Sequence, residues 1–162
     1  MKRLAACMLV LLCCPGFLRS EDVTRTEVFA GFSILSVEGA QGLGWQASAK
    51  GNLNGSIGIV ADVGGHYRFH LSAYQYLFGP ELTRRGRTAL FAHALIGGAR
   101  LEGFDSSTNR LALAFGGGVD LNATDRIAVR LFQLDWIPTR FEQSWQNRTG
   151  RIGFGLVFRP GR

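Results

Sequence analysis

The chain has 162 residues, of which 46% are hydrophobic, and a formal net charge of +6 at pH 7. This length supports a single domain. Three of the basic residues, Lys2, Arg3 and Arg19, lie in an N-terminal segment that we expect to be removed, which leaves 15 basic against 12 acidic residues. The remaining surplus is small and the basic residues are scattered along the chain. The sequence therefore lacks the clustered basic face that indicates a nucleic-acid-binding protein.

The N-terminus is predicted to be a signal peptide. Lys2 and Arg3 form a positive stretch, residues 4–12 form an apolar stretch, and Pro15-Gly16 follows. The apolar stretch has the length of a signal-peptide core and is too short for a transmembrane helix, which needs roughly 20 apolar residues. We therefore expect residues 1–20 to be cleaved and residues 21–162 to form one domain.

All three cysteines, Cys7, Cys13 and Cys14, fall in this N-terminal segment. Cys13 and Cys14 lie where a lipoprotein cysteine can be found, but Leu12 is too large for a good lipid-attachment sequence. The mature chain is therefore predicted to have no disulfide, no thiolate metal site and no cysteine nucleophile.

The rest of the chain is a series of strand-like runs in which apolar residues recur at every second position. The run over residues 110–121 is the clearest, because Leu111, Leu113 and Phe115 alternate with small residues. Pro80 removes a hydrogen bond from its run, so we expect a bulge or a strand end there. The eight predicted strands cover residues 27–35, 44–50, 56–66, 72–83, 88–102, 110–121, 126–139 and 151–158.

The connections between these runs alternate in length. Short turns are predicted around Asn54, Gly86 and Thr124. Longer polar loops are predicted over residues 36–42, 103–109 and 141–149, and only the connection near Phe69 is short where a long one is expected. Alternating short turns and long loops are typical of outer-membrane barrels, whose turns lie on the periplasmic side. An even number of strands places both chain ends on that side.

The two faces of the runs differ in a way that indicates a membrane rather than water outside. One face carries the large apolar and aromatic side chains, whereas the other carries Gly, Ala, Ser and a few charges. An eight-stranded barrel has an interior only just wide enough for side chains, so the small residues belong inside. Trp145, in a predicted loop, is either an interface anchor or a contact for a surface partner. Aromatic residues predicted at the membrane interfaces are Trp45, Tyr74, Tyr76, Trp136 and Phe158.

The inward face is predicted to carry a network of charged side chains. Arg130 and Asp135 cannot both face inward on one regular strand, so we predict a β-bulge near Phe132. Charges in a narrow lumen must be paired, because an isolated buried charge is costly. The network either fills and plugs the barrel or forms a narrow ion pore. Its predicted members are Glu27, Lys50, Asp62, His66, Glu81, Asp120, Arg130, Asp135 and Arg151.

Catalysis is a weaker hypothesis. His66 or His70 could pair with Ser72 at the outer rim, but no acid is obviously placed beside either pair. His93 stands alone in an apolar run and is predicted to be packed or to face the lumen. Three histidines without a paired spacing argue against a metal site. We therefore predict no catalytic residue, no cofactor and no metal ligand.

Several stretches resemble the small, porin-like outer-membrane β-barrel family built on the OmpA-type eight-stranded transmembrane domain. They are GWQAS (44–48), GIVAD (58–62), YLFGP (76–80), FAHAL (91–95), GGGVD (116–120), RLFQLDW (130–136) and GLVF (155–158). The resemblance covers nearly all of the mature chain, and its order and spacing are more specific than its single motifs. One departure is that Phe158 is followed by Arg159-Pro160-Gly161-Arg162, whereas such chains often end on the aromatic residue.

The resemblance implies an all-β fold, an eight-stranded antiparallel up-and-down transmembrane β-barrel in the outer membrane of a Gram-negative bacterium. It also implies a monomer that meets membrane lipid, and periplasmic chaperones and the barrel-assembly machinery during biogenesis. Three functions remain open: a structural or surface-interaction role with an unidentified surface partner, a narrow diffusion pore, and a soluble periplasmic lipocalin-like ligand-binding barrel.

Overall fold

The computed structural model describes residues 26–68, 71–103, 106–141 and 144–160. The predicted signal peptide (1–20), its three cysteines and His70 lie outside the described residues. Across the described ranges there is no helix long and apolar enough to span a membrane.

The described residues form ten strands, and eight of these correspond to the eight predicted strands. Their bounds are β1 (Thr26–Val37), β2 (Ala40–Asn52), β3 (Ile57–Arg68), β4 (Leu71–Arg84), β5 (Thr88–Gly103), β6 (Ser106–Asn122), β7 (Ile127–Trp136), β8 (Thr139–Phe141), β9 (Ser144–Gln146) and β10 (Thr149–Phe158).

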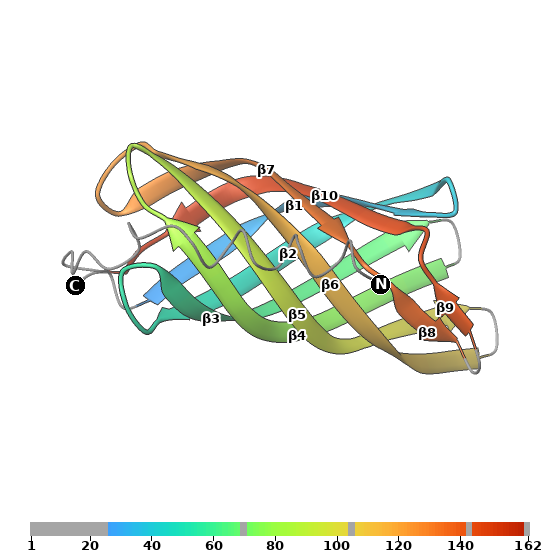
Figure 1. Ribbon diagram of the computed structural model, residues 1–162. Coiled ribbons are helices and arrows are strands. Elements are labelled where there is room, and N and C mark those ends of the chain that lie inside the picture. The colour runs from blue at the N-terminus through green and yellow to red at the C-terminus, as the bar shows by residue number, and fades with distance from the viewer. Residues whose placement is uncertain (1–25, 69–70, 104–105, 142–143, 161–162) are drawn as a thin grey trace.

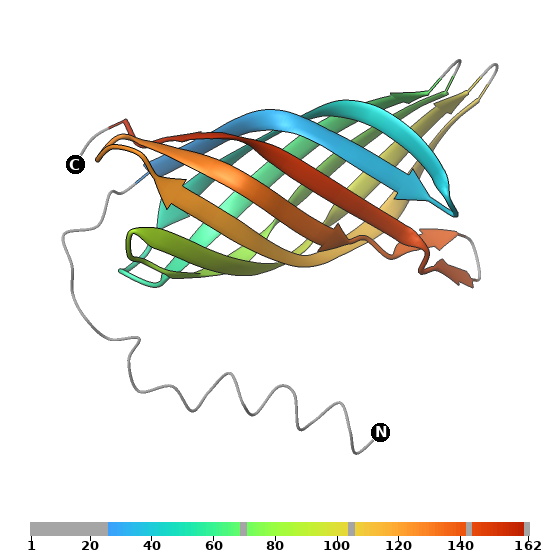
Figure 2. The ribbon, with the colours of Figure 1, turned by 90° about the horizontal axis from the view of Figure 1, so that it is seen from above.

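The eight long strands close into an antiparallel barrel. Neighbouring strands from β1 to β7 pair in chain order, β7 pairs with β10, and β10 pairs with β1 to complete the ring. The short strands β8 and β9 form a hairpin that extends from the wall beside β6. Figures 1 and 2 show the long strands tilted around one axis, as closure requires. The predicted eight-stranded up-and-down barrel is confirmed.

The two ends of the barrel differ. We call one the terminal end: it holds the start of β1, the end of β10 and the turns β2–β3, β4–β5 and β6–β7. We call the other the distal end: it holds the end of β1, the start of β2, the end of β5, the start of β6 and the β8–β9 hairpin (Figure 2). This arrangement follows from an even number of antiparallel strands.

The predicted long loops are wrong in their extent. Only Glu38 and Gly39 separate β1 from β2, and both have positive φ (51° and 88°), which suits a tight hairpin turn. Likewise, β5 extends to Gly103 and β6 starts at Ser106, and the segment 141–149 contains β9. The polar and glycine residues of these segments predicted loops. In the structure they mark only the edge of the apolar outer face, and the strands remain hydrogen-bonded to one another beyond it.

The predicted bulge near Phe132 is confirmed. On β6, Val119 faces Phe132 and Asp120 faces Arg130, so Leu131 is the extra residue. Leu131 and Phe132 are both exposed, whereas the strand alternates regularly on either side of them. The bulge thus lets Arg130 and Asp135 both face inward.

Pro80 does not produce the expected bulge or strand end. It lies inside β4, opposite Ile59 of β3. Pairing with β5 is interrupted between Phe78 and Glu81, but the register is the same on both sides of the interruption. The missing N–H is therefore tolerated as a local loss of pairing at Gly79 and Pro80, without a shift in register.

Candidate functional site

The outer face of the barrel is apolar. Phe32, Phe78 and Leu156 are 69%, 60% and 57% exposed, and they stand among many other outward aliphatic and aromatic side chains. A contiguous apolar surface of this kind is unusual on a protein that meets water. The strand alternation therefore places the hydrophobic side chains on the outside, the reverse of a soluble barrel.

The predicted interface aromatics lie on this outer face. Trp136 donates a hydrogen bond from Nε1 to the backbone oxygen of Asn147 (2.7 Å), and its ring lies 6.0 Å from that of Phe115. Trp45 Nε1 lies 3.4 Å from the hydroxyl of Tyr67. The others of the set are Tyr74, which is half-buried, and Tyr76 and Phe158, which are exposed.

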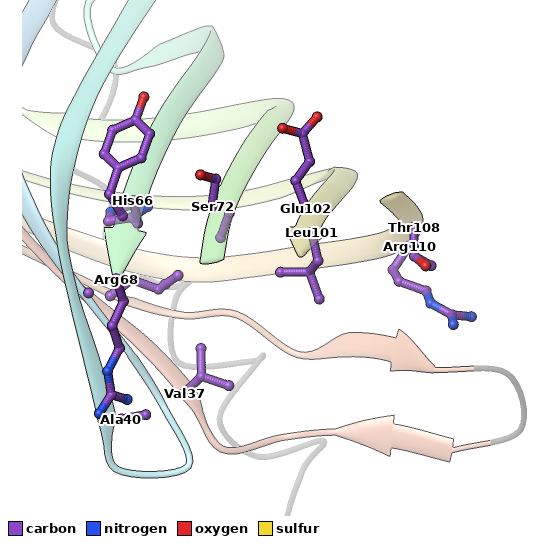
Figure 3. Close-up of a pocket in the computed structure, with 13 residues that line it drawn as sticks. Val37, Ala40, His66, Arg68, Ser72, Leu101, Glu102, Thr108 and Arg110 are labelled. Atoms are coloured by element: carbon purple, nitrogen blue, oxygen red, sulfur yellow. The ribbon is translucent and has the colours of Figure 1, made fainter. Parts of the chain in front are cut away.

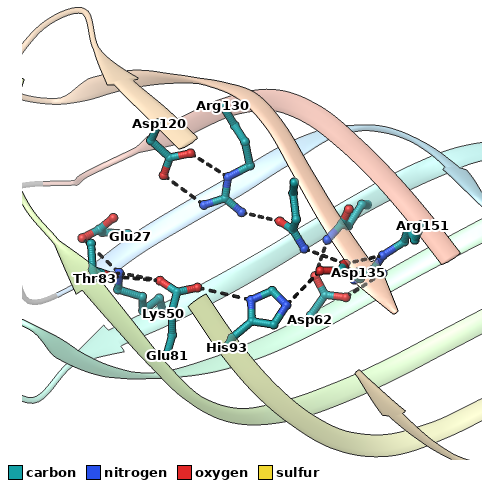
Figure 4. Close-up of polar contacts among 12 residues, drawn as sticks. Glu27, Lys50, Asp62, Glu81, Thr83, His93, Asp120, Arg130, Asp135 and Arg151 are labelled. Atoms are coloured by element: carbon teal, nitrogen blue, oxygen red, sulfur yellow. Dashed lines mark hydrogen bonds and ion pairs between the residues drawn. The ribbon is translucent and has the colours of Figure 1, made fainter. Parts of the chain in front are cut away.

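The structure places all nine residues of the predicted polar network inside the barrel. Each is at most 7% exposed, although each carries a charge or an imidazole. Figure 4 shows most of them converging on the lumen from the surrounding strands. The nine are Glu27, Lys50, Asp62, His66, Glu81, Asp120, Arg130, Asp135 and Arg151.

Glu27 is the centre of the charged cluster nearest the terminal end. Its carboxylate lies 2.8 Å from Arg85 Nη1, 3.7 Å from Lys50 Nζ and 3.5 Å from Arg159 Nε. Lys50 in turn donates to Glu81 Oε1 at 2.8 Å. One carboxylate thus faces three cations, and the lysine links it to a second carboxylate.

Arg130 occupies the next level of the lumen. Its guanidinium binds both carboxylate oxygens of Asp120, at 2.8 and 3.1 Å, in the two-pronged geometry that makes such pairs strong. The same group lies between two aromatic rings, 4.4 Å from the centre of Phe29 and 4.1 Å from the centre of Phe91. Gln133 accepts a further hydrogen bond from Arg130 Nη1 at 2.6 Å. Charge pairing and stacking together hold this side chain across the lumen.

Arg151 occupies the level nearer the distal end. Its side chain is fully buried and lies 2.8 Å from Asp62 Oδ1 and 2.7 Å from Asp135 Oδ2. Gln46 donates to the other oxygen of Asp62 at 2.6 Å. One arginine therefore joins carboxylates from β3 and β7 across the barrel.

His93 completes the network, and the sequence did not identify it as a member. Its Nε2 lies 2.9 Å from Asp135 Oδ1 and its Nδ1 lies 3.6 Å from Glu81 Oε2, so it connects the Arg151 level with the cluster of Glu27, Lys50 and Glu81 (Figure 4). Both faces of the run 88–102 are apolar, so alternation did not show which way His93 points. Gln133, which bridges Arg130 and Asp135, was missed because an uncharged amide gives no such signal.

Of the two His–Ser pairs considered above, the pair of His70 with Ser72 involves a residue outside the described ranges, and the pair of His66 with Ser72 is not formed. His66 does not contact Ser72; its Nε2 lies 2.7 Å from the hydroxyl of Ser33, and both side chains are buried. Within the described ranges, Nδ1 of His66 has no hydrogen-bond partner, so no carboxylate completes a Ser–His–acid set. The same ranges contain no group of three or more His, Cys, Asp or Glu placed to hold a metal ion.

No protein-family model and no curated protein sequence matches the chain. Solved structures do match. Neisserial surface protein A superposes with a TM-score of 0.67 at 14% identity, covering 83% of this chain and 95% of that one. The N-terminal β-barrel domain of Pseudomonas aeruginosa OprF gives 0.55 at 12% identity, covering 83% and 97%. The Yersinia pestis outer membrane protein Ail, in a phospholipid bilayer nanodisc, gives 0.55 at 14% identity, covering 85% and 99%.

At these identities the likeness concerns the fold. The closed ring of eight antiparallel strands, the apolar outer face and the charged lumen are all consistent with it. The chain therefore has the fold of the small eight-stranded outer-membrane β-barrels.

Proposed function

We propose that this protein is an outer-membrane barrel with a structural or surface-interaction role, whose lumen is closed by its own charged side chains. The observation that carries the proposal is the inversion of the two faces: hydrophobic side chains cover the outside, while charged groups pair with one another inside.

The apolar outer face supports residence in lipid. Only helices and closed barrels satisfy every backbone hydrogen bond inside a bilayer, and this barrel is closed. A soluble lipocalin-like barrel would need its large apolar side chains inside. Here Phe32, Phe78 and Leu156 point outward instead, which disfavours that alternative.

Strand length supports a role at the cell surface. A membrane-spanning strand needs about 9–11 residues, whereas β5 and β6 have 16 and 17. With the terminal end in the periplasm, the excess, together with the β8–β9 hairpin, projects at the distal end. Two of the similar structures are named a surface protein and an attachment invasion locus protein, which agrees with such a role.

The lumen contacts favour a plug over a diffusion pore. Arg130 is fixed by Asp120 and by the rings of Phe29 and Phe91, and Arg151 is fixed by Asp62 and Asp135. A pore would need these groups to separate, which leaves buried charges without partners. The narrow pore stays as the second candidate because a network of this kind conducts if it opens.

Biogenesis follows from the same proposal. The chain is exported by its signal peptide, guided by periplasmic chaperones and folded by the barrel-assembly machinery as a monomer in contact with outer-membrane lipid.

Conductance in planar bilayers tests the closed lumen. The wild-type protein is expected to show little conductance, and a variant with alanine at Asp62, Asp120, Arg130 and Arg151, which removes the ion pairs of both lumen levels, is expected to conduct. Arg100→Ala is the matched control, because Arg100 pairs with Glu102 on the exposed surface. High, steady conductance by the wild type would contradict the plug and favour the pore.

A further inference from the structure

We propose that the distal mouth of the lumen binds a small single-chain carboxylate amphiphile, such as a medium-chain fatty acid. We call this mouth the vestibule and define it by Leu35, Val37, Arg68, Ala73, Leu101 and Arg110 around His66. The inference goes beyond the proposed function and requires only that the barrel be folded.

The walls of the vestibule are apolar. It encloses a volume of about 450 Å³, to which Leu35, Val37, Ala73 and Leu101 contribute hydrophobic side chains. Figure 3 shows Val37 and Leu101 on opposite walls. Small-molecule pockets have volumes of roughly 300–1,000 Å³ and mostly apolar linings with a few polar groups. The size suits one alkyl chain rather than a lipid with several.

The vestibule has a closed floor. His66 lies there, buried and held by the hydroxyl of Ser33. The Arg151–Asp62 and Arg151–Asp135 pairs form the adjacent level of the lumen. A ligand entering from the distal end therefore stops at this level, and the vestibule is a blind pocket rather than the entrance of a channel.

The charge of the vestibule selects the head group. Arg68 and Arg110 are among the residues that line it. Among the lining residues that the structure describes, the carboxylate is that of Glu102, which lies 2.8 Å from Arg100, a neighbour on the same strand. A carboxylate at the mouth would gain charge-assisted hydrogen bonds from the exposed Arg68, while its alkyl chain lies against Leu35 and Leu101.

The test is a binding titration in phosphatidylcholine nanodiscs with ¹³C-carboxyl-labelled decanoate, followed by NMR and corrected with empty nanodiscs. Decanol and decyltrimethylammonium have the same chain and serve as uncharged and cationic probes. We expect saturable binding of decanoate and roughly tenfold weaker binding of the other two, the loss of one charge-assisted contact.

Two pairs of variants locate the site. Ala73→Phe fills the vestibule and is expected to abolish binding, whereas Ala61→Phe, on the outer face, is expected to leave it unchanged. Arg68→Gln is expected to weaken decanoate binding roughly tenfold and to leave decanol unchanged, whereas Arg84→Gln, at the terminal end, changes neither. Arg68 is exposed at the rim, so Arg68→Gln is expected to fold normally. This variant therefore still tests the site if Ala73→Phe lowers the folding yield.

Three results would overturn the proposal. Decanoate could bind no more than in empty nanodiscs, all three probes could bind equally, or the Ala73→Phe and Arg68→Gln variants could bind decanoate as the wild type does. The same preparations are run unheated on a gel to verify that the barrel is folded. If the barrel is folded but does not bind decanoate, only the vestibule proposal is contradicted. If the protein is unfolded or soluble in water, the proposed function itself is contradicted.

Discussion

Arg151 Nη2 and Asp135 Oδ2 lie 2.7 Å apart in the lumen, where neither side chain is exposed by more than 1%. The same guanidinium also reaches Asp62 at 2.8 Å. The arginine thus bridges two carboxylates that come from strands on different parts of the ring.

Replacing Arg151 with alanine is expected to destabilise the barrel by about 3–5 kcal/mol, because it leaves two buried carboxylates without their cation. Urea-induced unfolding in phospholipid vesicles measures the loss. Arg100→Ala removes an exposed pair that is 48% and 42% accessible, and should cost about 1 kcal/mol or less. Equal effects of the two substitutions would show that the lumen pair is not a buried ion pair in the folded protein.

Deleting Leu131 is expected to be tolerated. Without this residue Arg130, Phe132 and Gln133 alternate regularly, and their partners on β6 stay the same. Deleting Leu134 instead reverses the alternation on one side of the gap and turns either Gln133 or Asp135 toward lipid. The fraction of folded barrel on an unheated gel compares the two deletions. A Leu131 deletion that folds no better than the Leu134 deletion would contradict the bulge.

Gly155→Ala is expected to cost about 1–3 kcal/mol, the usual cost of overpacking. A Cβ at Gly155 would press against the backbone oxygen of Ala30 and lie 2.5 Å from the Cα of Gly31 on β1, the strand that closes the ring. Gly51→Ala is the control, because a Cβ there meets nothing within 4 Å. Urea unfolding of both variants tests the close approach, and equal stability would show that the β1–β10 seam is looser than described.

Phe154→Arg is expected to destabilise insertion by about 2–4 kcal/mol, because the residue points outward from the middle of β10 into the hydrocarbon. Ile127→Arg, also outward but at the first residue of β7, should cost only about 0–1 kcal/mol near the interface. Folding titrations in vesicles measure both. If Phe154→Arg proves as harmless as Ile127→Arg, the outer face does not lie in lipid.

The alternation of apolar and small or polar side chains along the sequence predicts most of the fold. It placed eight strands, and the conflict between Arg130 and Asp135 located a bulge in a strand that otherwise looks regular. These features follow from the strict two-residue period of a strand whose two faces meet different surroundings. The inward positions of the nine predicted network residues follow from the same period, whereas Arg85 and Arg159, which also contact Glu27, were not predicted.

Other features needed the structure. The starts of β2 and β6, at Ala40 and Ser106, lie beyond the apolar belt, where polar and glycine residues interrupt the two-residue period, so the sequence predicts loops there. His93 is buried in the lumen, as one of the two expected positions has it, but its apolar neighbourhood gave no sign that it joins the ion pairs. Gln133 was missed because an uncharged amide does not mark the inward face. The vestibule depends on Leu35, Ala73 and Leu101, which are far apart in sequence and meet only once the register of several strands is set.

The most direct test of a closed, lipid-embedded barrel is electrophoresis of the detergent-purified mature protein with and without boiling, combined with flotation of the membrane fraction. We predict that the unboiled protein migrates differently from the boiled protein and floats with the membranes. A protein that stays soluble without detergent and shows no shift on boiling would contradict the account.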